Sequence, residues 1–275
     1  MGSLARRQPL GVAGGILVLT IVFIAIFADQ LSVYDSELID FDSMLSAPDD
    51  AHWLGTDQFG RDLWTRLMYG ARTALFIGFF CAFFGATIGL VIGVASAYFG
   101  GTVDLILQRI IDVFMAFPLI IMALALVSVF GSEIENVMLA ITLPFIPDCA
   151  RVVRANALQI REIPYVDAAR AMGFGHTRII LRHMLPNVMA PYLIILTSNI
   201  GQAILLGASL SYLGLGVQEP TAAWGLMLQG GAEEYAESAP WVAVFPGLAI
   251  AISVFGFNLF GDAMRDILDP RLRSR

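Results

Sequence analysis

Apolar residues fill six long runs of this chain, and shorter polar segments separate them. The runs cover residues 10–28, 73–99, 110–130, 137–158, 188–212 and 241–260. In the first run Thr20 is the only polar side chain, and its length corresponds to about 28 Å of helix, enough to cross a hydrocarbon core. The pattern predicts an all-α integral membrane protein with six transmembrane helices.

Composition supports this class. The chain is 57% hydrophobic and 14% charged, and its mean hydropathy of +0.75 lies outside the range of soluble proteins. Arg6 and Arg7 precede the first run, as they would in a signal peptide, but the run is too long for one and no A-x-A site precedes Asp29. We therefore expect an uncleaved anchor helix at about residues 10–29.

The arginines predict the orientation. With the N-terminus in the cytosol, only Arg61, Arg66 and Arg72 fall on the outer side, against thirteen on the inner side. The positive-inside rule then predicts that both termini are cytosolic. The inner arginines are Arg6, Arg7, Arg109, Arg151, Arg154, Arg161, Arg170, Arg178, Arg182, Arg265, Arg271, Arg273 and Arg275.

Acidic residues dominate the predicted outer side, and the net charge of the chain is −7. This acidity is consistent with a solvated loop, and also with a surface on which a soluble partner docks. The residues are Asp35, Glu37, Asp40, Asp42, Asp49, Asp50, Asp57, Asp62, Glu233, Glu234 and Glu237.

Several kinds of chemistry have no signature here. All sixteen basic residues are arginine, so a phosphate-binding loop of the G-x-x-x-x-G-K-[ST] type is excluded. The three histidines show no metal-ligand or triad spacing, and the two cysteines fall in predicted spans. We expect no catalytic residue, no bound cofactor or metal, and no nucleic-acid partner.

We divide the chain into two parts. Residues 1–70 comprise the anchor and an acidic extracellular segment; residues 71–275 form a five-helix core. Leu63, Trp64, Leu67 and Met68 recur at helical spacing and predict an interfacial helix leading into the second span. The glycine-rich segment at about 213–240 is too broken to span, so we expect it to dip into the outer leaflet and pack against helices.

The fourth span is irregular because it contains Pro144, Pro147 and Asp148. The prolines predict a kink or an opening in the helix. An acid inside a membrane span indicates a functional position, here one that faces a water-filled path or an interface. The alternative is that Asp148 neutralises Arg151 one turn later.

The cytosolic loop at about 159–186 contains "PYVDAARAMGFG". Pro164 favours the start of a short helix, Asp167 suits its first turn, and Gly173 or Gly175 can end it. Such a short helix is marginal alone, so a partner should hold it. The following "TRIILRHMLP" predicts an amphipathic piece at the membrane surface. The alternative for the whole stretch is an ordinary inner loop.

The order acidic–Ala–Ala, three residues, Gly173, then an apolar segment ending in Leu185 and Pro186 resembles the EAA loop of permease subunits of bacterial ABC importers. The segments "GTDQFGRD" at 55–62, "LSYLGLGVQEPTAAWGLML" at 210–228 and the tail "FNLFGDAMRDILDPRLR" resemble the second, C-type permease of dipeptide, oligopeptide and nickel importers. The chain departs from the family pattern at Asp167, which replaces a glutamate, and at the prolines of the fourth span.

The resemblance implies a type I ABC importer permease fold in the bacterial inner membrane. It also implies a second homologous permease, two ATPase subunits that bind ATP and magnesium, and an extracellular binding protein. The implied ATPase-coupling residues are Tyr165, Asp167, Ala168, Ala169, Met172, Gly173 and Pro186.

Rival interpretations remain open at this point. A gradient-driven transporter would use Asp148 as its ion site, and a membrane scaffold would leave the cytosolic pattern unexplained. Among importers, short peptides are favoured over nickel because no His/Cys/Met cluster indicates a metal path.

Overall fold

The computed structural model describes residues 9–268, and this part of the chain is almost entirely helical. Its only β-type pairing is an isolated bridge between Thr56 and Asp62. The helices, in chain order, are α2 (Pro9–Ile26), α3 (Ala28–Leu31), η1 (Phe41–Ser43), α4 (Leu63–Phe99), α5 (Gly101–Met115), α6 (Leu119–Phe130), α7 (Ile134–Arg161), α8 (Pro164–Ala171), α9 (His176–Ile179), η2 (Ile180–Met184), α10 (Leu185–Tyr212), α11 (Trp224–Glu234) and α12 (Trp241–Leu268).

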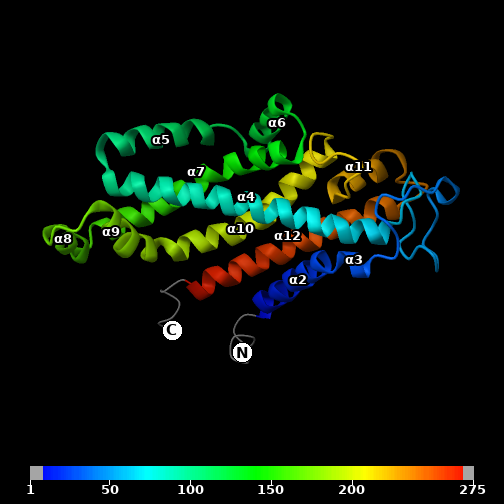
Figure 1. Ribbon diagram of the computed structural model, residues 1–275, viewed down its shortest axis with the longest axis horizontal. Helices are drawn as coiled ribbons and strands as arrows, with labels where there is room; N and C mark the ends of the chain where they lie inside the picture. The colour runs from blue at the N-terminus through cyan, green and yellow to red at the C-terminus, as the bar shows by residue number, and fades with distance from the viewer. Residues whose placement is uncertain (1–8, 269–275) are drawn as a thin grey trace.

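The long helices lie side by side and make an elongated bundle (Figure 1). Helices α8 and α9 form one end, while α11 and the segment before α4 form the other. Five helical stretches are long and apolar enough to cross a membrane: α2, α4, α7, the run His176–Tyr212 and α12. The number becomes six if the bent pair α5 and α6 counts as one span.

The third expected span is not one straight helix. Helices α5 and α6 meet at an angle of 89° across residues 116–118. Pro118 explains the break, because its ring disfavours the helical conformation of Phe117 and its nitrogen has no proton to donate. The hydrophobic pattern did not predict this bend, because the residues on both sides of Pro118 are apolar.

The second span begins earlier than expected, since α4 is a single helix of 37 residues. Asp62 caps it by accepting a hydrogen bond from the amide of Thr65 at 2.8 Å. Leu63, Leu67 and Met68 are buried in the core of the bundle. The prediction of a separate interfacial helix is therefore wrong: their spacing reflects packing against other helices.

Glycines allow α4 and α7 to pack closely. Gly85, Gly89 and Gly93 recur every fourth residue of α4 and face α7. A β-carbon added at Gly89 would come within 2.7 Å of the Cys149 β-carbon. This small-residue spacing is typical of tightly packed membrane helices.

Helix α7 continues without interruption through Pro144 and Pro147, both of which are buried. The expected opening of the helix does not occur. Packing against α4 holds this stretch helical although two amide donors are missing.

The expected surface helix after Gly175 is also absent as a separate element. Residues 176–184 run continuously into α10, through the π-helical turn η2. Ile179 and Met184 are buried in the core instead of lying on a membrane surface. Pro186 follows this turn as the second residue of α10.

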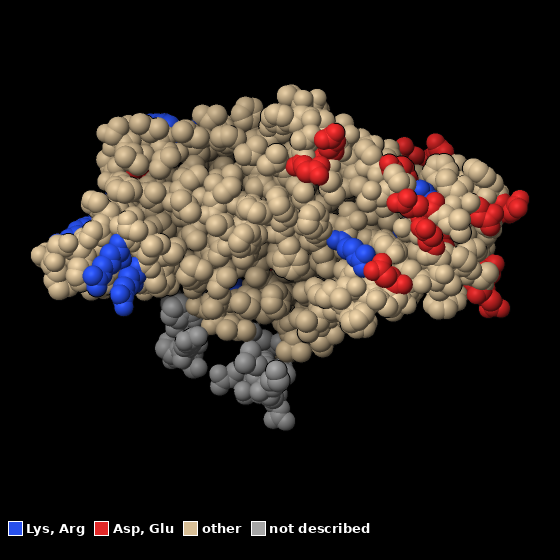
Figure 2. All heavy atoms as spheres, viewed as in Figure 1, with Lys and Arg blue, Asp and Glu red and all other residues tan. Residues whose placement is uncertain are grey.

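Charge separates the two ends of the bundle, as Figure 2 shows. Acidic side chains gather at the end formed by α11 and residues 32–62, and arginines lie near α8 and α9. This distribution agrees with the predicted outer and inner sides. Asp57 and Asp62, however, are buried at 4% and 5% exposure, so these two acids belong to the packing of the outer end.

Candidate functional site

Helix α8, at the inner end, is the predicted coupling element. Ile163 is its N-cap residue, and Pro164 occupies its first turn. Its C-terminus is a Schellman motif: the amide of Phe174 donates to the Ala169 carbonyl at 3.1 Å, and that of Gly173 donates to Arg170 at 2.9 Å. Gly173 has a φ of +77°, which glycine adopts without strain. The sequence predicted these bounds to within two residues.

Only two side chains of α8 are buried, those of Val166 and Ala169. They pack with the ends of α4 and α7 and with η2. Ala169 is 1% exposed, so its side chain is enclosed by this chain and is not available to another subunit. The prediction grouped it with Ala168, but helical spacing turns these neighbours to different faces.

The other predicted coupling residues lie on the surface. Met172 is 65% exposed and Tyr165 is 38% exposed. Asp167, Ala168, Gly173 and Pro186 are also exposed. The surface of the inner tip thus includes the apolar side chain of Met172 and the ring of Tyr165.

Tyr165 does more than add apolar area. Its hydroxyl donates to the His183 carbonyl at 2.9 Å, and the Asn187 side-chain amide donates to the Tyr165 oxygen at 3.0 Å. The Asn187 amide also reaches the His183 carbonyl, at 2.7 Å. Because His183 lies in η2 and Asn187 in α10, Tyr165 links α8 to the start of the fifth span. Residues 162 and 163 join α8 directly to α7.

Sequence reasoning missed this link, because the partner of the Tyr165 hydroxyl is a carbonyl group in the π-helical turn η2. The amide of Leu185 donates to the Ile180 carbonyl, five residues earlier. A π-helical turn displaces the regular bonding pattern, and in many proteins it lies at a functional position. The sequence feature that indicates an irregular turn here is Pro186, which lacks an amide proton.

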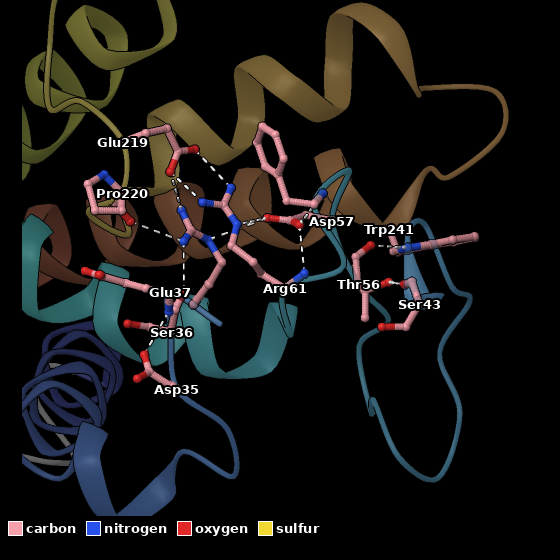
Figure 3. Close-up of polar contacts among 12 residues, drawn as sticks. Asp35, Ser36, Glu37, Ser43, Thr56, Asp57, Arg61, Glu219, Pro220 and Trp241 are labelled. Atoms are coloured by element: carbon pink, nitrogen blue, oxygen red, sulfur yellow. Dashed lines mark hydrogen bonds and ion pairs between the residues drawn. The ribbon is translucent and has the colours of Figure 1, made fainter. Parts of the chain in front are cut away.

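Two distant segments meet at the outer end, where Arg61 contacts Glu219, 158 positions later in the sequence. Arg61 of "GTDQFGRD" donates from Nε to Asp57 at 2.7 Å and from Nη1 and Nη2 to the two carboxylate oxygens of Glu219 at 2.6 and 3.0 Å (Figure 3). Arg66 is fully buried beside them and donates to the Ser36 carbonyl at 2.9 Å. We call Asp57, Arg61, Arg66 and Glu219 the outer network.

Electrostatics in the outer network favour the ionised forms of Glu219 and Arg61. Burial by itself raises the pKa of Glu219, but the hydrogen bond from Arg61 and the charge of Arg66 lower it further than burial raises it. Burial also opposes the charged form of Arg61, yet Glu219 and Asp57 raise its pKa. The network is thus a hydrogen-bonded set of charges that ties α4 to the loop before α11.

Two tryptophan side chains also join segments of the chain at the outer end. Trp224, the first residue of α11, donates to the Leu67 carbonyl at 3.0 Å, and Trp241 donates to Thr56 at 3.2 Å. Gly225, which follows Trp224, packs against the backbone of Ala208 in α10. The segment at 213–240 therefore packs against α4 and α10.

The predicted ion pair between Asp148 and Arg151 does not form. Arg151 instead donates to Asp112 of α5 at 2.7 Å. Asp148 is exposed on α7, and it makes no hydrogen bond or ion pair with any residue between 9 and 268. Pro144 and Pro147, by contrast, are buried.

The described residues contain no group of three or more His, Cys, Asp or Glu side chains positioned to hold a metal ion. Both cysteines are free and buried. His52 is near Asp62, at 3.0 Å, and His176 is near the Tyr98 hydroxyl, at 2.7 Å.

Comparisons with known proteins agree with this arrangement. The family described as binding-protein-dependent transport system inner membrane component matches residues 85–274, and the N-terminal transmembrane domain of oligopeptide transport permease C matches residues 5–48. A dipeptide transport system permease protein of Alkalihalophilus pseudofirmus is 40% identical over 98% of this chain and 88% of its own. A glutathione transport system permease protein of Pectobacterium atrosepticum is 42% identical over 98% and 89%.

Among solved structures, a chain of the MetNI methionine ABC transporter in an inward-facing conformation matches with a TM-score of 0.59. It is 21% identical, and the match covers 74% of this chain and 96% of that one. At this identity the likeness concerns the fold alone.

Proposed function

This chain belongs to the family of binding-protein-dependent transport system inner membrane components, and from that premise we propose that it forms half of a translocation path for short peptides. It is a multi-pass inner membrane protein and a permease subunit. Family membership supports transport driven by a separate ATPase over a gradient-driven transporter or a membrane scaffold. In the proposed assembly this chain is not catalytic, and ATP and magnesium belong to its partners.

One observation carries the coupling proposal: α8 buries Val166 and Ala169 and leaves its other face open at the inner tip. Two ATPase subunits would lie beneath this chain and a second homologous permease. An ATPase would bind the open face, which includes Asp167, Ala168 and Met172. Movement of the ATPases would pass through α8 to α7 along the chain, and to α10 through Tyr165.

The relatives named for dipeptide and glutathione transport support short peptides as the substrate class. A binding protein would deliver the peptide to the outer end, where nine exposed acidic residues surround the outer network. The network would hold that docking surface in one shape, since its members come from distant segments.

The test compares Ala168→Glu with Thr102→Glu in the assembled importer. Both residues are exposed at the inner side, but only Ala168 lies on α8. We expect Ala168→Glu to reduce peptide uptake at least tenfold and to abolish stimulation of ATP hydrolysis by the loaded binding protein. The amount of subunit in the membrane and its melting temperature should not change. Normal coupling in Ala168→Glu would overturn the proposed role of α8.

A further inference from the structure

Helix α7 carries a carboxylate that the described chain leaves without a partner. Asp148 is exposed about halfway along this 28-residue helix, some 20 Å from either end. A carboxylate at such a depth is costly in contact with lipid, so it should face water or a cation.

The next two arginines after Asp148 on α7 bond to other acids. Arg151 pairs with Asp112 at 2.7 Å, and Arg154 donates to both carboxylate oxygens of Asp104 at 2.6 Å. Both arginines therefore bond to acids of α5, and Asp148 bonds to neither of them.

An ionised carboxylate offers hydrogen-bond acceptors only, which suits a positively charged ammonium group with its three donors.

Resting on the proposed function, we propose that Asp148 lines the aqueous path and accepts the amino-terminal ammonium group of the peptide in transit. That group is positively charged at neutral pH. Helix α7 leads directly into α8, so the same helix that ATPase movement displaces would carry the contact. A binding site on the moving wall would release the peptide when the path opens inward.

Uptake kinetics test the contact. In the complete importer we expect Asp148→Asn to lower the maximal rate of dipeptide uptake at least tenfold, with little change in KM, which the binding protein sets. Asp148→Glu should restore at least half of the rate. Glu135→Gln, an exposed acid in the first turn of the same helix, is the matched control for loss of one acid. An unchanged maximal rate in Asp148→Asn would overturn the inference.

Chemical labelling tests the location. We expect Asp148→Cys to react with a membrane-impermeant methanethiosulfonate, and saturating dipeptide with binding protein and ATP to slow that reaction. Leu248→Cys, exposed on the apolar surface of α12, should not react. Reaction of Asp148→Cys only with a membrane-permeant maleimide would place it in lipid, and no reaction with either reagent would place it against another subunit. Both results contradict the proposal.

Failure of the proposed substrate and failure of the proposed role of Asp148 give different results. If the wild-type importer takes up no dipeptide, the proposed substrate is wrong, whatever Asp148 does. If it takes up dipeptide and the Asp148 variants behave as wild type, only the assignment of Asp148 is wrong.

Discussion

The two ends of this bundle are built in opposite ways. At the outer end, charged side chains from distant segments bond to one another, indole groups donate to backbone carbonyls, and Arg66 is fully buried. At the inner end, α8 buries two small side chains and exposes the rest. The difference agrees with the proposal that another subunit covers the open face of α8, whereas the outer end is held by contacts within this chain.

The largest expected effect comes from breaking the outer network. Asp57→Ala removes the acid that Arg61 contacts at 2.7 Å, in a site where both side chains are 5% exposed. Of the residues that the structure describes, Glu219 would then be the one acid facing both Arg61 and Arg66, and the excess buried positive charge should cost about 3–5 kcal/mol. Thermal unfolding in detergent measures the loss, and Asp50→Ala in the same segment should unfold as wild type does. Equal melting temperatures for the two variants would show that the network does not stabilise the outer end.

A smaller effect follows from pH. The pKa of Glu219 is lowered in the folded state from 4.5, so its contribution to stability is present above about pH 4.5. That contribution is lost as the pH falls toward the lowered value, because the unfolded chain then binds the proton more readily. We expect the melting temperature to drop below pH 4.5, and to drop less in Glu219→Gln. Parallel pH profiles would contradict this.

At the inner end, Tyr165→Phe removes the hydroxyl that bonds to His183 and Asn187. Each hydrogen bond contributes about 1 kcal/mol, so the stability change should be small. The coupling of ATP hydrolysis to import should be reduced more than stability is. We expect ATP hydrolysis to continue while less peptide is imported per ATP. The ratio of uptake to hydrolysis checks this, and an unaltered ratio would mean that α8 acts only through α7.

The smallest effect is expected for Arg170→Ala. Its bond to Asp167, at 3.1 Å, joins two side chains that are 39% and 66% exposed. Exposed ion pairs of this spacing contribute under about 0.5 kcal/mol. The melting temperature should therefore stay within experimental error of the wild-type value, in contrast to Asp57→Ala.

Sequence patterns predicted most of the spans and the bounds of α8, because hydrophobic runs and capping residues act over a few neighbouring positions. They did not predict the 89° bend between α5 and α6, since the residues on both sides of Pro118 are apolar. They also placed Ala169 with Ala168, although only one of the two is exposed. The pairing of Arg61 with Glu219 depends on contacts between segments 158 residues apart, which local spacing does not reveal.

Hydrogen exchange in the assembled importer tests whether α8 contacts the ATPase subunits. We expect the amides of residues 164–173 to exchange at least tenfold more slowly when the ATPase subunits are bound than in the permease pair alone. Amides of residues 55–66, at the outer end, should exchange equally slowly in both. If residues 164–173 exchange at the same rate with and without the ATPases, α8 is not the contact through which ATP hydrolysis drives this permease.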